Sequence, residues 1–127
     1  MGRPVQLQIQ VVDAGQFVRA DATGKVDLAA SLRMARELSA FGGEDNVLPI
    51  LLDVRGLSGA LSTLDMVEFV KVLMTERDRY RRKVALLARG DGQQDRAHFL
   101  ELYSTNRGIP IAAFTDYDSA LKWLGEP

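Results

Sequence analysis

The sequence predicts an α/β fold with a small mixed sheet of about five strands and about four helices, in the order ββαβαβαβα. Apolar residues alternate with glutamines over residues 5–12, which is typical of a strand with one buried face. After that first hairpin, apolar runs alternate with amphipathic stretches, which indicates right-handed crossovers and a mostly parallel sheet. A length of 127 residues with 46% hydrophobic residues suits a single domain over residues 1–127.

Each element follows from its local pattern. A strand at residues 5–12 is joined by a short turn to a second strand, which begins at residues 17–20 and is closed by Thr-Gly-Lys at 23–25. The two strands should pair antiparallel. An amphipathic helix is expected over residues 27–41, with Asp27 as its N-cap. Residues 47–54 are almost all apolar, as in a strand covered on both faces. The remaining predicted elements are a helix at 62–77, a strand at 83–89, a helix at 94–105, a strand at 109–114 and a helix at 116–124.

Composition excludes several classes of function. The net charge of −1 argues against nucleic-acid binding, and the absence of cysteine excludes disulfides and thiolate metal sites. The basic cluster at residues 77–83 is interpreted as the solvated end of a helix. The chain shows no signal peptide, no apolar run long enough to span a bilayer, and no nucleotide-binding motif. We therefore expect a soluble cytoplasmic protein with no cofactor and no bound metal.

Three stretches, together with the element order, resemble a known family. They are Ile-Leu-Leu-Asp-Val-Arg-Gly-Leu at 50–57, Lys-Val-Ala-Leu-Leu at 83–87, and Phe-Thr-Asp-Tyr-Asp-Ser-Ala-Leu-Lys-Trp-Leu at 114–124. In this order they resemble the STAS domain superfamily, and most closely its SpoIIAA-like branch of uncharacterised bacterial proteins, which are like anti-sigma-factor antagonists. The resemblance implies a STAS fold and a non-enzymatic regulatory or protein-interaction domain. Partner binding would use the loop and helix at residues 56–69.

The same resemblance suggests a phosphorylation site. In the regulatory members of the family, a partner kinase phosphorylates a serine at the start of the helix after the central strand. This position corresponds to Ser62 here, with Thr63 beside it, while Leu61 and Leu64 replace the family's flanking Asp and Gly. Ser62 followed three residues later by Asp65 is also close to a capping box, so the helix-capping role and the phosphoacceptor role both stay open.

Polar and glycine residues follow three of the predicted parallel strands. Ligands and partners commonly bind at this edge of an open α/β sheet, although ordinary turns and helix caps use the same residue types. The candidate partner or ligand edge consists of Asp53, Arg55, Gly56, Ser58, Gly59, Arg89, Asp91, Thr115 and Asp116.

The helix predicted at residues 62–77 carries more apolar residues than one buried stripe requires. Met66, Phe69 and Leu73 are the excess. Either another element of the chain covers them, or they form a protein interface, whose simplest version is a homodimer.

Two further functions are open. A small-molecule or lipid carrier, in the manner of the related Sec14-type folds, would have an apolar cavity between helices and sheet. A hydrolase would need Asp53 or His98, the only histidine, in a cleft within hydrogen-bond reach of a hydroxyl.

Overall fold

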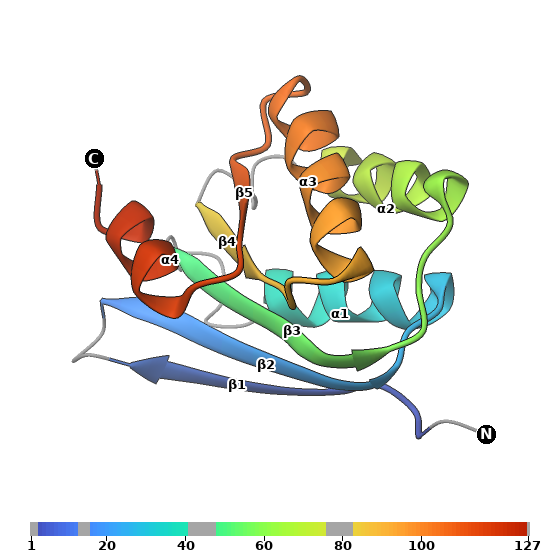
Figure 1. Cartoon of the computed structure of the whole chain (residues 1–127), viewed down its shortest axis with the longest axis horizontal. Helices are drawn as coiled ribbons and strands as arrows, with labels where there is room; N and C mark the ends of the chain where they lie inside the picture. Colours follow the sequence, from blue (N-terminus) through green and yellow to red (C-terminus); the bar gives the residue numbers. More distant parts are fainter. Residues whose placement is uncertain (1–2, 13–15, 41–47, 76–82, 127) are drawn as a thin grey trace.

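A five-stranded mixed sheet forms the centre of the computed structural model, which describes residues 3–12, 16–40, 48–75 and 83–126 (Figure 1). The strands are β1 (Gln6–Val12), β2 (Phe17–Lys25), β3 (Ile50–Ser58), β4 (Val84–Leu87) and β5 (Ile111–Phe114), and they lie side by side in this order. β1 and β2 are antiparallel, and every other neighbouring pair is parallel. The predicted fold class and element order are confirmed.

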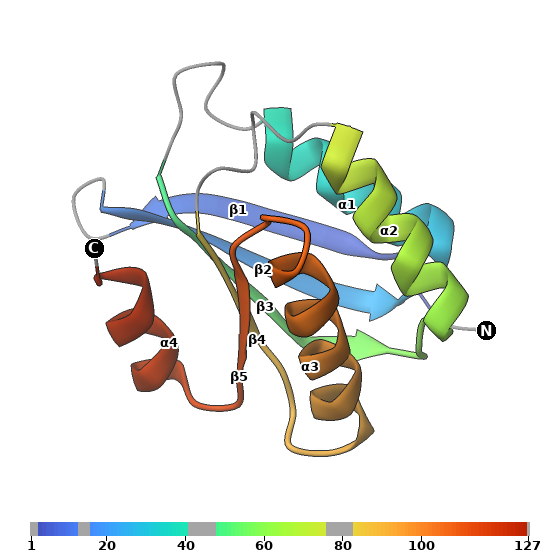
Figure 2. The same ribbon diagram turned by 90° about the horizontal axis from the view of Figure 1, so that it is seen from above.

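Four helices cover the two faces of the sheet unequally. They are α1 (Leu28–Ala40), α2 (Thr63–Thr75), α3 (Gly92–Thr105) and α4 (Tyr117–Leu124). The first three lie on one face and α4 lies on the other (Figure 2). Because strand side chains alternate between faces, Ile50 and Leu52 point towards α1–α3, whereas Leu51 packs with α4. The sheet is therefore buried on both faces at β3 and β4, as the apolar run in β3 indicated.

The second strand ends at residue 25 as predicted, but the predicted end of the third strand at residue 54 was wrong. β2 extends to Lys25, and β3 extends to Ser58 alongside it, so Gly56 and Ser58 lie in a strand rather than in a loop. Glycine is uncommon in strands, which made residues 56–58 look like a turn. At Gly56, however, a Cβ atom would lie 3.0 Å from the Ala22 carbonyl oxygen, so this register shift between the strands requires close backbone approach.

Neighbouring helices cover much of the apolar surface of α2. Met66 and Leu73 are buried, Phe69 is half-buried, and all three pack on the side facing α1 and α3. The apolar residues of α2 were expected either to be covered by another element of the chain or to form a protein interface. For these three residues, burial against α1 and α3 is sufficient. Leu64, at the start of the helix, is 77% exposed.

Parts of three predicted elements lie outside the described residues. They are the end of the first helix at 41, the start of the following strand at 47, and the end of the helix at 76–77. The basic cluster at 77–83 is described only at Lys83, whose ammonium group donates hydrogen bonds to the carbonyls of Trp123 and Glu126. Asp27 caps α1 as expected, because its carboxylate accepts a hydrogen bond from the Ala30 backbone N–H at 2.8 Å.

Candidate functional site

Arg89 and Asp91 join the end of β3 to the start of α3. The Arg89 guanidinium donates hydrogen bonds to the carbonyls of Arg55, at 2.6 Å, and Leu57, at 2.8 Å. It also pairs with Asp91 at 3.1 Å. Asp91 is the N-cap of α3, and the hydrogen bond from the Gln93 backbone N–H, with that from Arg89, lowers the pKa of its carboxyl. Arg89 and Asp91 therefore have a structural role, because they connect β3 to the start of α3.

Asp53 lies on the opposite face of the sheet from α1–α3. Its carboxylate accepts hydrogen bonds from the backbone and guanidinium of Arg55, the shortest at 2.9 Å, and lies 4.0 Å from Arg19. Burial alone would raise the pKa of Asp53, but the hydrogen bonds and charge of Arg55, with the charge of Arg19, outweigh burial and lower the pKa. Asp53 is thus an ionised partner of two arginines.

Thr115 and Asp116 line a pocket of about 220 Å³ together with His98 and Ser119. Asp116 caps α4 and accepts hydrogen bonds from the Ser119 hydroxyl and backbone N–H, which lower its pKa. The His98 Nδ1 atom lies 3.6 Å from the Glu101 carboxylate. Within the described ranges, no hydrogen bond joins His98 or Asp53 to a hydroxyl group. The hypothesis that the protein is a hydrolase requires such a contact.

Ser62 is exposed and caps α2. Its hydroxyl accepts a hydrogen bond from the Asp65 backbone N–H at 3.1 Å, and the Ser62 N–H points back to the Asp65 carboxylate at 3.5 Å. The predicted capping box is confirmed. Thr63 is also exposed, and Gly59 turns the chain with a φ of 78° before the helix begins.

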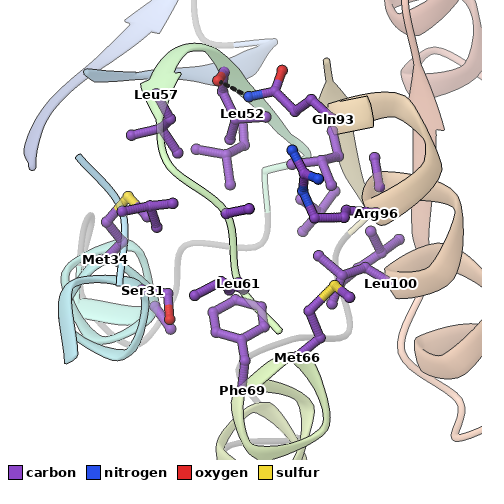
Figure 3. A pocket seen from close by; sticks show the side chains of 18 of the residues that line it. Ser31, Met34, Leu52, Leu57, Leu61, Met66, Phe69, Gln93, Arg96 and Leu100 are labelled. Carbon is purple, nitrogen blue, oxygen red and sulfur yellow. Dashed lines mark hydrogen bonds between the residues drawn. The ribbon is translucent and has the colours of Figure 1, made fainter. Parts of the chain in front are cut away.

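An apolar cavity of about 120 Å³ lies where α1, α2 and α3 meet the sheet (Figure 3). The hypothesis of a small-molecule or lipid carrier predicted an apolar cavity in this position. Among its walls are Met34 and Leu38 from α1, Leu52, Val54 and Leu57 from β3, Met66, Phe69 and Leu73 from α2, and Ala97 and Leu100 from α3.

Among the described residues, three polar side chains also line the cavity: Ser31, Gln93 and Arg96. The Ser31 hydroxyl donates to the Leu28 carbonyl at 2.8 Å. The Gln93 amide nitrogen donates to the Val54 carbonyl at 2.8 Å, and its amide oxygen accepts from the Arg89 N–H at 2.7 Å. The Arg96 side chain makes no hydrogen bond or ion pair with any residue that the structure describes.

Sequence reasoning did not identify Gln93 or Arg96 as site residues. It placed Ala97 and Leu100 on the buried stripe of the third helix, and Gln93 and Arg96 lie four residues before each of them. Residues four apart share a helix face, so this spacing was the available signal.

The described part of the chain holds no group of three or more histidine or carboxylate side chains suited to a metal ion. Likewise, none of its helices is long and apolar enough to cross a membrane.

Comparison with solved structures identifies the fold. An uncharacterised protein of the DUF3478 family from Shewanella loihica PV-4, which has a SpoIIAA-like fold, superimposes with a TM-score of 0.62 at 20% identity, over 94% of this chain and 93% of that one. This chain has the SpoIIAA-like fold. An anti-sigma factor antagonist from Mycobacterium paratuberculosis also superimposes on this chain, with a TM-score of 0.61 at 14% identity, over 96% of this chain and 95% of that one. No protein-family model and no curated protein matches the sequence.

Proposed function

We propose that this protein is a non-enzymatic regulatory domain that binds a protein partner through residues 56–69, which comprise the end of β3, the loop after it and the first turns of α2. The observation that carries this proposal is Leu64, which is 77% exposed on the first turn of α2. It stands beside the exposed Ser62 and Thr63 and close to Gly59 and Ala60 in the loop. The structural similarity to an anti-sigma factor antagonist supports a protein partner.

Ser62 is well placed to regulate such contact. A phosphoryl group there would add about −1.5 to −2 charges at neutral pH, three residues from the Asp65 carboxylate and two from Leu64. It would also replace the hydroxyl that now accepts the Asp65 N–H. We infer that phosphorylation at Ser62 would weaken an apolar contact centred on Leu64.

A matched pair of leucines provides the test. Leu64→Glu alters the proposed surface, whereas Leu102→Glu alters α3 at a position that is 65% exposed. Proteins that co-purify from the native host with wild type and with Leu102→Glu, but not with Leu64→Glu or Ser62→Glu, would support the proposal. Equal recovery with all four would refute it. Native mass spectrometry of the same samples would show whether the partner is a second copy of this chain.

The cavity favours a second candidate function, the binding of a small apolar molecule. Its size is comparable with that of an engineered apolar cavity of about 150 Å³ that accepts benzene. Native mass spectra of protein purified under mild conditions should show a bound small molecule. Ala97→Leu adds a larger side chain to the cavity wall and should abolish that signal while circular dichroism shows an intact fold. A ligand retained by Ala97→Leu would place binding elsewhere.

A further inference from the structure

We propose that the cavity binds a single-chain amphiphile with an anionic headgroup, and that Arg96 binds the headgroup. The proposal rests on the second candidate function, because it specifies the chemistry of the cavity's ligand. It goes beyond that function in naming the charge of the ligand and the residue that recognises it.

The polar side chains of the cavity wall differ in how many of their hydrogen-bonding groups are free to bind a ligand. Gln93 uses both ends of its amide on backbone atoms, and the Ser31 hydrogen is donated to a backbone carbonyl. Arg96 has up to five N–H donors and uses none of them on another described residue. Among the described residues of the cavity wall, Arg96 is therefore the polar side chain left unoccupied, and it is a permanent cation.

Arg96 lies where a headgroup would have to be. It is half-buried, so its side chain both lines the cavity and is reached by solvent. Figure 3 shows it reaching from α3 towards the cavity, next to Gln93. Its Nη1 atom would lie 3.4 Å from a Cβ atom built on Gly92, which places the charge over the first turn of α3. The positive end of that helix dipole adds to the attraction for an anion.

The neighbouring carboxylates do not neutralise this charge. Asp91 is paired with Arg89 and accepts the Gln93 N–H. Asp95, next to Arg96 in the sequence, is exposed and forms no ion pair with it. An incoming anion therefore meets a guanidinium that has no competing partner among the described residues.

The remainder of the wall fits a hydrocarbon chain. Leu52, Phe69 and Leu100 are among the side chains that line the cavity, and no second unpaired charge lies in the described cavity wall. A ligand with charges along its length would leave them buried without partners, at high cost. A short acyl chain with one terminal carboxylate matches both parts of the site.

The test compares two probes that share a chain and differ in the headgroup, octanoate and 1-octanol. Their dissociation constants are measured by nuclear magnetic resonance titration, with shifts at α2 and α3 confirming the binding position. Arg96→Gln should weaken octanoate binding about tenfold, equivalent to about 1.4 kcal/mol, and leave octanol binding unchanged. Arg96→Lys should retain most of the octanoate affinity. Arg36→Gln, which removes an exposed arginine from α1 outside the cavity wall, is the charge-matched control and should behave as wild type.

The possible outcomes separate the two proposals. Equal loss of octanoate affinity in Arg96→Gln and Arg36→Gln would refute headgroup recognition and indicate a general charge effect. If both probes bind to the wild type and Arg96→Gln changes neither, Arg96 merely covers the cavity with its aliphatic stem, and only the binding of apolar molecules stands. If neither probe causes shifts at α2 and α3 of the wild type, the second candidate function itself is wrong.

Discussion

Replacing Ser104 with alanine should stabilise the protein. The Ser104 side chain, near the end of α3, has no solvent exposure, and its hydroxyl has no hydrogen-bond partner among the described residues. Burying a hydroxyl without a partner costs about 1–3 kcal/mol, and alanine is also the better helix former. The void left by one oxygen atom offsets part of the gain. We expect a net stabilisation of about 1 kcal/mol, which for a domain of this size raises the Tm by roughly 3–5 °C.

Ser31→Ala is the matched control, because Ser31 is also buried in a helix and only 3% exposed, but its hydroxyl donates to the Leu28 carbonyl. We expect this variant to be neutral or to lose up to about 1 kcal/mol. Urea denaturation with both variants and wild type measures the difference directly. If Ser104→Ala loses stability as Ser31→Ala does, then the Ser104 hydroxyl is hydrogen-bonded in solution, and the reasoning from its isolation is wrong.

Substitutions at three further positions test other parts of the structure. Gly24→Ala should lower the free energy of unfolding, measured by urea denaturation, by about 3 kcal/mol or more, because φ is 107° and the new Cβ would clash with the Pro4 carbonyl oxygen. A loss below about 1 kcal/mol would contradict this geometry. Ser62→Ala should cost about 1 kcal/mol and Ser62→Asp much less, since only aspartate can still cap α2; equal thermal shifts would exclude the cap. The pKa of Asp53 is lower in the folded protein than in the unfolded chain, where it is about 3.9, so the ionised carboxylate stabilises the fold fully above that pH. This stabilisation is lost as the pH falls through the pKa of Asp53 in the folded protein. The urea midpoint of Asp53→Asn, measured between about pH 5 and 2, should therefore change less with pH than that of the wild type. If the midpoints of both proteins change equally with pH, ionised Asp53 does not stabilise the fold.

Periodicity predicted the fold because each element has a simple pattern. The alternation of β1 places Leu7 and Ile9 against the core and the glutamines outside. The unbroken apolar run in β3 reflects its central position, with helices on both faces. Capping was equally local, since Asp27 and Ser62 each lie within three residues of the N–H groups that they bind.

The remaining features depend on contacts between distant segments. β3 continues through Gly56 because β2 supplies partners up to Lys25, and residue preferences within residues 50–58 do not contain that information. Arg89 looked like part of a binding edge, yet it binds carbonyls more than 30 residues away in β3. The cavity exists because the side chains of three helices do not fill the space above β3, which depends on side-chain volumes brought together by the whole fold.

Helix α2 carries both proposed functions on different surfaces. Leu64 and Ser62 face solvent at its start, while Met66, Phe69 and Leu73 face the cavity. If α2 keeps the same position with and without ligand, Leu64→Glu should leave octanoate binding unchanged and Arg96→Gln should leave partner recovery unchanged. If occupancy of the cavity displaces α2, ligand and partner must alter each other's affinity by the same factor, because coupling free energy is reciprocal. Measuring the affinities for octanoate and for the protein partner in Leu64→Glu and in Arg96→Gln therefore distinguishes two independent binding sites from two energetically coupled ones.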